Sequence, residues 1–362
     1  MDSKAMAAAN TLSPPVVVIG GANVDIQGKS SAQFRIGDSN PGTIGTAFGG
    51  VGRNVAEACV RLGLKVSLIT VFGGDPEGKL MEEDCRAKGM DTDLSLRWEG
   101  PNARYLCALD ADGSLVGAVA DMEAMDALSP SHLQASATVL DRATCIVVDT
   151  NIPHESIAWL CRRYGRKSGI VRDAGRPMLF LDTVSETKAV KALGLFGEFD
   201  CIKPNMAEAR VMADARETGE SRFMASTGYS KGLPSVPSQA VSEGDPELVK
   251  RRIESLGQLP GELYISLGPR GMYYGAKGEA GVVPLPPEEL RPLVRNRSGA
   301  GDCALAGLVW ASIEGYRPRE KVYYALAAAL LAAASPLPVP EDMDEKKLQD
   351  LAALIAERGQ KS

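Results

Sequence analysis

Histidine is scarce in this chain: only His132 and His154 occur among its 362 residues. A metal site built from several imidazoles, or a nucleophile activated by histidine, is therefore disfavoured. Any general base is more naturally a carboxylate, because Asp and Glu are the other common groups for that role.

Paired cysteines and long apolar runs are also missing. The seven cysteines form no Cys-x-x-Cys pair, which favours a reducing compartment and buried thiols over a disulfide framework. The longest apolar stretch, Val322 to Ala334, is about half to two thirds of the length that a bilayer crossing requires. The first residues have neither the basic start nor the apolar core of a secretory signal. We therefore expect a cytoplasmic protein with no membrane partner, and an organellar location stays open.

The charge balance is only mildly acidic. The formal net charge is −6, with 24% charged and 44% hydrophobic residues, which is typical of a globular protein of one large domain or two. Surfaces that bind nucleic acid are strongly basic. We therefore expect no nucleic-acid partner, whereas an anion held at one local site remains compatible with this composition.

Short apolar strands alternate with amphipathic helices along most of the chain. The first two predicted strands, Val16–Gly20 and Val66–Thr70, flank a helix predicted over Arg53–Leu62. Further apolar runs lie at Cys145–Val148, Met178–Leu181, Cys201–Lys203 and Leu263–Ser266. This alternation predicts an α/β fold around a largely parallel sheet.

Two segments break the alternation. The stretch at 26–47 is strand-like with little room for a helix, and the stretch at 102–120 contains two strand-like runs around Asp112-Gly113. Asp-Gly between two such runs is a strong hairpin signal. We expect both segments to form one small separate sheet.

Two other segments have distinct compositions. Residues 216–245 are rich in Ser, Gly and Pro, which predicts a mobile surface insertion. Residues 337–362 are polar and predict a helical C-terminal tail.

The cluster Gly49-Gly50-Val51-Gly52 precedes the first predicted helix. Glycines at this position let the backbone approach a ligand closely, and the helix start offers free N–H groups. A plain structural turn is an equally good interpretation. Asn54, just inside the helix, is either a cap or a ligand contact.

A second cluster, Gly299-Ala300-Gly301-Asp302, opens the helix predicted over Cys303–Glu314. The N–H groups of this helix start can converge on an anion, and the helix dipole adds to the attraction. Asp302 falls in the first turn. It is either a helix-start carboxylate or a general base beside the anion site, and we expect the dipole to keep it ionised at neutral pH.

Smaller fragments fit a nucleotide and a polyol. Asn205 and Glu208 share one helix face and carry oxygens that suit hydrated magnesium, although a capped surface helix is the default for such a pair. Asp25, at a strand end, can accept hydrogen bonds from two adjacent hydroxyls, or it is a turn residue. Ser266, Gly268 and Gly271 close a strand with spacing suited to a turn near phosphates.

The order of these motifs resembles the PfkB, or ribokinase-like, family of sugar kinases. An Asn-x-Asp strand, a GGxGxN helix start, N-x-x-E, S-x-G-x-x-G and GAGD follow one another between Val16 and Pro336. Within that family, GGANVDIQGKS, GDSNPGTI before FGGVGRN, and Asp121-Met122 resemble the pseudouridine kinases. Ribokinases usually carry GGKGAN where this chain has GGVGRN.

The resemblance implies a fold and an activity. The expected fold is a three-layer α/β/α sandwich over residues 16–336 with a small β-sheet lid, joined into a homodimer through the lids. The expected activity is ATP-dependent phosphorylation of the pseudouridine 5′-hydroxyl, with Mg²⁺. Two alternatives stay open: another ribose or nucleoside kinase (for ribose, adenosine or uridine), and a catalytically silent nucleoside-binding protein.

The resemblance also implies a role for each matching residue. Asp302 would remove the proton from the 5′-hydroxyl, while Gly299, Ala300 and Gly301 form the anion hole. Asn205 and Glu208 would hold magnesium through water. The sugar contacts would be Asn23, Asp25, Gly50 and Asn54, and the ATP contacts would be Asn205, Ser266, Gly268 and Gly271.

The chain departs from the family pattern at Asn296-Arg297-Ser298, where Asp-Thr-Thr is usual. That aspartate commonly helps to bind a monovalent cation, so Asn296 leaves potassium (K⁺) activation in question. Arg297 is either a fixed positive charge in its place or a solvated side chain.

Recognition of the base requires an additional polar contact. Pseudouridine carries an N–H on the edge beside the sugar, where uridine has a C–H, so a selective site must offer an acceptor or a bridging water. We favour Ser39, Asn40 and Thr43 of the DSNPGT loop, although each could instead only shape a turn. The other candidates are Ser30, Asp121 and Asn151.

Overall fold

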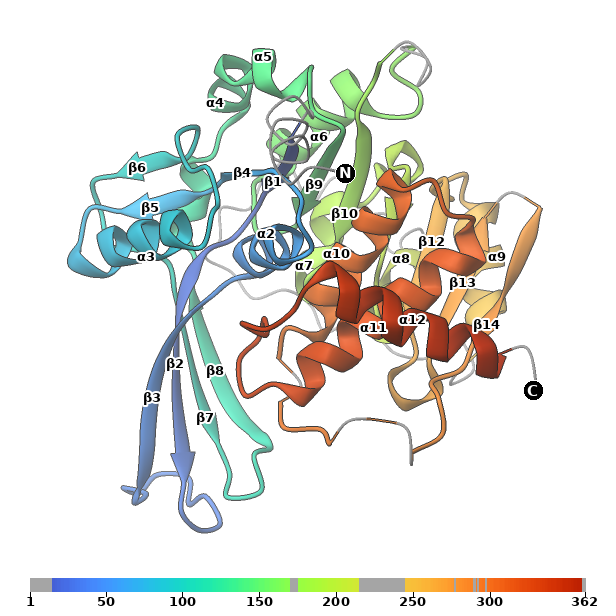
Figure 1. Ribbon diagram of the computed structural model, residues 1–362. Helices are drawn as coiled ribbons and strands as arrows, with labels where there is room; N and C mark the ends of the chain where they lie inside the picture. The colour runs from blue at the N-terminus through green and yellow to red at the C-terminus, as the bar shows by residue number, and fades with distance from the viewer. Residues whose placement is uncertain are drawn as a thin grey trace, which may run out of the picture.

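The computed structural model describes residues 15–169, 175–214, 245–276, 278–288, 291, 293–296 and 298–359. Arg297 and nearly all of the predicted insertion at 216–245 lie outside these ranges. Within them, eight strands form the main sheet in the order β14-β13-β12-β11-β10-β9-β1-β4 (Figure 1). The strands are β1 (Val16–Ile19), β4 (Val66–Ile69), β9 (Cys145–Asp149), β10 (Met178–Asp182), β11 (Cys201–Ile202), β12 (Glu262–Ser266), β13 (Met272–Ala276) and β14 (Glu279–Val283).

The six strands from β4 to β12 in this order run parallel. β13 is antiparallel to β12, and β14 is antiparallel to β13. A parallel strand covered on both faces needs apolar side chains at every position. This requirement explains the continuous apolar runs in the sequence, such as VVVI in β1, whose four residues are all buried.

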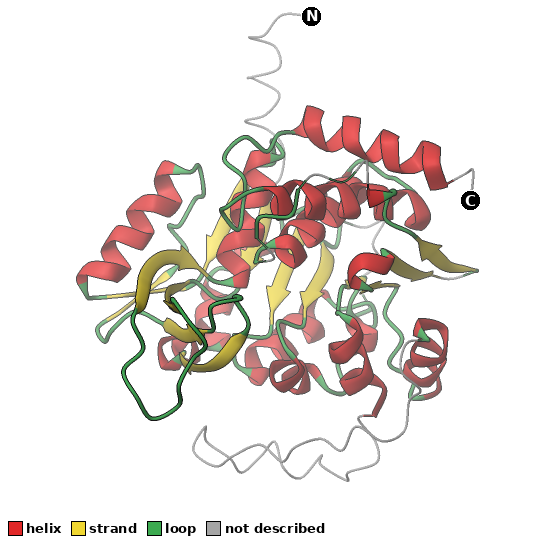
Figure 2. Cartoon of the chain, turned by 90° about the horizontal axis from the view of Figure 1, so that it is seen from below, coloured by secondary structure: helices red, strands yellow, loops and turns green. Residues whose placement is uncertain are grey.

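Helices cover both faces of the main sheet (Figure 2). Val16 and Val18 of β1 belong to one core, with side chains of α2, α10 and α11, whereas Val17 and Ile19 belong to a second core, with side chains of α6, α8 and α9. The α/β/α sandwich expected from the sequence is therefore confirmed. The helices are α2 (Val51–Arg61), α3 (Pro76–Ala87), α4 (Pro130–Ala135), α5 (Ala137–Leu140), α6 (His154–Tyr164), α7 (Glu186–Ala189), α8 (Met206–Asp214), α9 (Pro246–Ser255), α10 (Ala300–Ile313), α11 (Pro318–Ala334) and α12 (Glu345–Gly359).

A second sheet projects from the layered body as an arm (Figure 1). Its order is β3-β2-β7-β8, so the two segments that break the alternation do lie in one sheet. The Asp112-Gly113 turn joins β7 and β8, and Gly113 has a φ of 86°. A short pair, β5 (Val71–Gly73) and β6 (Leu96–Trp98), stands apart. The arm consists of β2 (Asn23–Ser30), β3 (Gly42–Gly49), β7 (Arg104–Leu109) and β8 (Leu115–Asp121).

The C-terminal helix α12 packs against the body. Leu348, Ala352 and Ile355 are buried in the same core as α10 and α11. The segment expected to be a polar helical tail does form a helix, and one apolar face of that helix is part of the hydrophobic core. In the described part of the chain, no helix is long and apolar enough to cross a membrane.

Candidate active site

The candidate site lies at the carboxyl ends of the parallel strands. β9 ends at Asp149, β10 ends at Asp182, and Lys203 directly follows β11. Because neighbouring parallel strands end at one edge of the sheet, this edge collects side chains that are distant in sequence, and ligands of open α/β sheets bind there. The sequence motifs did not identify any of these three residues as part of a site. The sequence feature that could have indicated them is an Asp at the end of each of two consecutive apolar strands.

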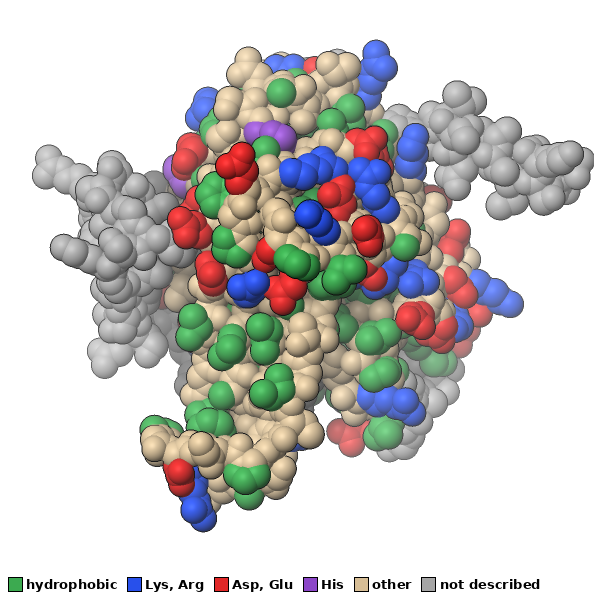
Figure 3. Space-filling model, turned by 90° about the vertical axis from the view of Figure 1, so that its left-hand side faces the viewer, with side chains coloured by type: hydrophobic (Ala, Val, Ile, Leu, Met, Phe, Trp, Pro, Cys, Tyr) green, Lys and Arg blue, Asp and Glu red, His purple; other side chains and the backbone are tan. Residues whose placement is uncertain are grey.

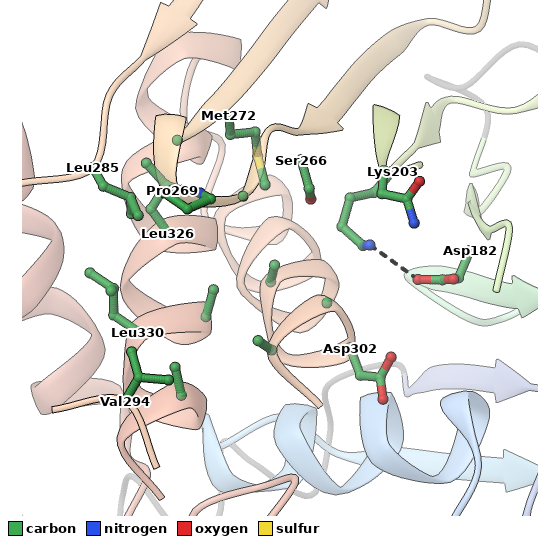
Figure 4. Close-up of a pocket in the computed structure, with 18 of the residues that line it drawn as sticks. Asp182, Lys203, Ser266, Pro269, Met272, Leu285, Val294, Asp302, Leu326 and Leu330 are labelled. Carbon is green, nitrogen blue, oxygen red and sulfur yellow. Dashed lines mark ion pairs between the residues drawn. The ribbon is translucent and has the colours of Figure 1, made fainter. Parts of the chain in front are cut away.

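A cavity of about 610 Å³ opens at this edge. Its volume lies within the range of small-molecule and nucleotide sites. One end is polar and contains Asp182, Lys203 and Asp302 (Figure 4). The other end is apolar. Its side chains are Met272, Leu285, Val294, Leu326 and Leu330.

Asp302 stands in the first turn of α10, at the wall of the cavity. Burial raises its pKa to about 7, the negative charge of Asp182 adds to the rise, and a hydrogen bond from Asn54 opposes it. The expectation that the helix dipole keeps Asp302 fully ionised at neutral pH is therefore wrong. Burial and a neighbouring carboxylate outweigh the dipole, which leaves a carboxylate whose pKa is close to neutrality.

Lys203 places a buried positive charge beside Asp302 and Asp182. Its Nζ lies 3.3 Å from Oδ2 of Asp182, and both side chains are almost fully buried (Figure 4). Burial alone would lower the pKa of Lys203, but Asp182, Glu208 and Asp302 raise it overall. A Cβ built on Gly301 would lie 3.6 Å from the Lys203 Nζ, so the ammonium faces the start of α10. Helix N–H groups and an ammonium together suit an anion.

Backbone strain marks the same edge. Val184, two residues after β10, has a φ of 61°, which is strongly disfavoured for a β-branched residue. Its N–H donates to Oδ1 of Asp182 at 2.8 Å, and Val184 also lines the cavity. Strain of this kind persists only where the surroundings enforce it, and it concentrates at functional sites.

Asn205 and Glu208 bind each other. Asn205 Nδ2 donates to Glu208 Oε1 at 2.7 Å, Asn205 N donates to Oε2 at 2.9 Å, and Glu208 N donates to Asn205 Oδ1 at 2.9 Å. Thr183 also donates to Oε2. This is a reciprocal cap of α8. Because both Glu208 oxygens accept hydrogen bonds from the protein, contact with magnesium through water fits this geometry better than direct ligation.

Among the described residues, no group of three or more His, Cys, Asp or Glu side chains is arranged to hold a metal ion. Asp182 is a carboxylate with spare capacity, because its buried Oδ2 has the ion pair with Lys203 but meets no hydrogen-bond donor of the described chain in hydrogen-bond geometry. A hydrated Mg²⁺ keeps several waters and takes one or two carboxylates plus substrate phosphates. Asp182 with the Asn205–Glu208 pair fits that requirement.

The turn between β12 and β13 forms another wall of the cavity. Ser266, Gly268 and Gly271, the residues expected to contact ATP, all line it. Gly271 has a φ of 101°, and a Cβ there would lie 2.1 Å from the carbonyl oxygen of Val283. The position therefore accepts glycine alone, whereas a Cβ at Gly268 would meet no atom of the described chain within 4 Å.

The residues expected to hold the sugar meet at the base of the arm. Asn54 Nδ2 donates to Asp302 Oδ2 at 2.8 Å, which connects this group to the cavity. Asn23 Nδ2 donates to Asp25 Oδ1 at 2.7 Å. Burial raises the pKa of Asp25. Gly50 has a φ of 101°, and a Cβ there would lie 2.4 Å from the carbonyl oxygen of Gly21, so the glycine cluster allows close contact between backbones.

The DSNPGT loop lies elsewhere. It follows the far end of β2, roughly 23 Å from Asn23 at about 3.3 Å per residue. Asn40 Oδ1 accepts from Arg35 N at 2.7 Å, and its Nδ2 donates to the Arg35 and Asp38 carbonyls. Asn40 therefore shapes its own loop, and the structure does not bring Ser39, Asn40 or Thr43 to Asp302. Thr43 pairs with Lys29, four positions beyond Asp25 along β2.

Asn151 does lie near the site, beside the end of β9. Its Oδ1 accepts from Lys188 Nζ at 2.5 Å, and its Nδ2 lies 2.6 Å from where a Cβ on Gly21 would be. Burial lowers the pKa of Lys188. Asn151 thus lies beside the β1–β2 turn that leads to Asn23 and Asp25. Asp121 also lies at the base of the arm, where it pairs with Arg104, which in turn pairs with Val24.

Asn296 does not suit a monovalent cation. Its Nδ2 donates to the carbonyl oxygen of Pro336 at 3.2 Å, and its Oδ1 accepts from Ser298 N at 2.9 Å. The NH₂ group of Asn296 thus faces a carbonyl oxygen. A residue that binds a cation at this place would have to present an oxygen atom instead. The proposal for Arg297 lies outside the described residues.

Comparison with known proteins places the chain in a family. Residues 14–341 match the pfkB family of carbohydrate kinases. The chain belongs to this family. Pseudouridine kinase of Escherichia coli (strain K12) is 30% identical over 321 residues, which are 88% of this chain and 90% of that protein. Ribokinase of Bacillus subtilis (strain 168) is 23% identical over 88% of this chain and 93% of that protein.

Solved structures share the fold of this pfkB kinase. Arabidopsis thaliana ribokinase complexed with ribose and ATP superposes with a TM-score of 0.72 at 20% identity, covering 94% of this chain and 99% of that chain. The pfkB assignment rests on most of the sequence, and the shared fold agrees with it.

Proposed function

We propose that this pfkB kinase transfers the γ-phosphoryl group of ATP to the 5′-hydroxyl of pseudouridine. The observation that carries the proposal is the hydrogen bond between Asn54 and Asp302. This bond links Asp302, whose pKa is about 7, to a residue expected to hold the sugar, which supports Asp302 as the base. The pseudouridine kinase of Escherichia coli, at 30% identity over 88% of the chain, supports the choice of substrate.

The proposed chemistry assigns a task to each part of the site. Asn23 and Asp25 would bind the ribose hydroxyls and orient the sugar. Asp302 would take the proton from the 5′-oxygen. Phosphoryl transfer otherwise requires alignment and stabilisation of charge on the equatorial oxygens. The N–H groups at the start of α10 and the ammonium of Lys203 would stabilise that charge, and bound magnesium would neutralise the phosphates further.

Substrate choice is tested by turnover on a small panel. A site built around the extra N–H of pseudouridine leaves a buried acceptor unpaired when uridine binds, at a cost of about 1–3 kcal/mol. We expect kcat/KM for pseudouridine to exceed that for uridine by at least about tenfold. The measurement is nucleoside-dependent release of ADP with pseudouridine, uridine, adenosine and ribose. Equal rates on both uridine isomers, or a preference for ribose, would refute the substrate while leaving the kinase intact.

We also propose that two copies pair through the arm. The register of β2, β3, β7 and β8 places Ile44, Leu106 and Val119 on one face, and they are 81%, 49% and 67% exposed. Figure 3 shows hydrophobic side chains scattered over the arm, with few charged side chains among them. An apolar sheet face of this kind is normally paired.

Light scattering at micromolar concentration tests this pairing. We expect twice the chain mass of 38.3 kDa and a monomer for Val119→Asp. The matched control is Leu80→Asp, which also adds a charge at an exposed leucine but on α3, away from the arm. A fully active monomer of the unmodified chain would contradict the proposal.

A further inference from the structure

Asp149 is a buried carboxylate that touches three separate segments. It is 2% exposed. Its Oδ2 accepts hydrogen bonds from the N–H groups of Gly21 and Gly52, both at 2.8 Å. Its Oδ1 accepts from the N–H of Asn151, also at 2.8 Å. One side chain therefore joins the β1–β2 turn, the start of α2 and the loop after β9.

The packing around Asp149 leaves no room for side chains at the neighbouring glycines. A Cβ on Gly20 would lie 2.4 Å from Asp149 Oδ2, and a Cβ on Gly52 would lie 2.7 Å from the carbonyl carbon of Gly20. The glycines at both positions thus allow the carboxylate to reach the two N–H groups. Three segments meet here at backbone contact distance, with Asp149 as their common acceptor.

These segments are the ones that carry the sugar-binding group. Gly21 is two residues before Asn23, Gly52 is two residues before Asn54, and Asn151 is two residues after Asp149. We infer that Asp149 is a positioning residue that sets the spacing between the nucleoside contacts of β2, α2 and the β9 loop. The inference rests on the proposed function, because it concerns the nucleoside half of that site.

The ionised form of Asp149 suits this task. Burial raises its pKa overall, although the N–H groups of Gly21 and Asn151, the Asn151 side chain and the charge of Lys188 oppose the rise. The hydrogen-bond geometry, rather than the pKa, identifies the form that is held. Two oxygens that face three N–H donors must both act as acceptors. An asparagine has only one acceptor oxygen, so its NH₂ group would face at least one backbone N–H.

The test compares Asp149→Asn with a matched variant at the opposite edge of the sheet. Asp200 precedes β11 and accepts hydrogen bonds from Arg176 and from Leu179 N. Asp200→Asn makes the same chemical change at a carboxylate that also accepts several hydrogen bonds, but far from the nucleoside contacts. For both variants the measurements are kcat, KM for pseudouridine and for ATP, Tm, and the nucleoside Kd by calorimetry.

We expect Asp149→Asn to raise the nucleoside KM and Kd by about tenfold to a hundredfold, the range supplied by one or two charge-assisted hydrogen bonds. KM for ATP should change less than about twofold. Asp200→Asn should lower Tm while both KM values stay normal. If Asp149→Asn does not fold, Asp149→Ser keeps a small acceptor and should show the same selective rise.

Two results overturn the inference. One is an unchanged nucleoside Kd in the Asp149 variants, and the other is an equal loss for nucleoside and ATP with a fall in Tm like that of Asp200→Asn. Either leaves the proposed function standing if the unmodified protein is active. An unmodified protein that neither binds nor phosphorylates any nucleoside contradicts both the function and the inference.

Discussion

Replacing Asp302 with asparagine is expected to lower kcat by about 10²–10⁴, the usual contribution of a positioned general base. The substitution keeps the shape of the side chain, and the Asn54 amide can still donate to the remaining oxygen. KM for the nucleoside should therefore change far less than kcat. Steady-state kinetics on pseudouridine measure both, and near-normal turnover would return Asp302 to the role of a helix-start residue.

The same variant should be more stable than the unmodified protein at pH 8. The pKa of Asp302 is about 7 in the folded chain and about 3.9 in the unfolded chain. As the pH rises from about 4 to about 7, only the folded state keeps the proton, so stability falls by up to about 4 kcal/mol. Asparagine does not titrate and avoids that loss. If Asp302 is a base, Asp302→Asn has a higher Tm and loses turnover. If Asp302 is a structural carboxylate, the substitution lowers Tm instead.

The pH profile follows from the same pKa. A base with a pKa of about 7 loses its free form as the pH falls below neutrality, so kcat should fall about tenfold per unit on the acid side. The Asp302→Asn variant should show a flat residual rate over that range. A kcat of the unmodified enzyme that stays constant down to pH 5 would contradict Asp302 as the base.

Gly299→Ala is expected to lower kcat on the order of 10²-fold, because it displaces the start of α10. Gly299 has a φ of 78°, and a Cβ there would lie 2.1 Å from the carbonyl oxygen of Pro338. The backbone must move to relieve that overlap. A shift of about 1 Å at a reacting centre is enough for such a loss, and Asp302 lies in the first turn of the helix that Gly299 caps.

Gly315→Ala provides the control at the other end of the same helix. Gly315 has a φ of 79°, but a Cβ there would meet no atom of the described residues within 4 Å. It carries the same left-handed penalty of about 1–2 kcal/mol without the overlap. We expect a lower Tm and normal kcat for Gly315→Ala. Equal kcat for the two variants would show that the start of α10 does not contribute to catalysis.

The sequence predicted the layers of the fold because each buried strand is a continuous apolar run. β1, β9 and β10 lie within a residue of their predicted bounds, and the Asp112-Gly113 turn joins β7 and β8 as expected. The C-terminal helix was predicted as well, but its packing against the core was not, because α12 is polar on average. Its buried side chains, such as Leu348 and Ile355, share one face of the helix, and a composition count does not show that.

The site was only partly predictable. Motifs that are contiguous in sequence, such as the start of α10, could be recognised directly. Asp149, Asp182 and Lys203 could not be grouped, because parallel pairing of β9, β10 and β11 brings them together. The pKa of Asp302 depends on that grouping, since Asp182 raises it and Lys203 lowers it. The distance between Asn40 and Asp302 depends on the length of the arm, so the motif that contains Asn40 could not show it.

We propose that Asp302 and the start of α10 serve phosphoryl transfer to a nucleoside 5′-oxygen. Phosphorus NMR and mass spectrometry of the product from ATP and pseudouridine test it in one experiment. We predict one equivalent of pseudouridine 5′-phosphate for each ADP formed, and at least about a hundredfold less of it with Asp302→Asn over the same time. ADP formed without a phosphorylated nucleoside, or a phosphate on another hydroxyl, would contradict it.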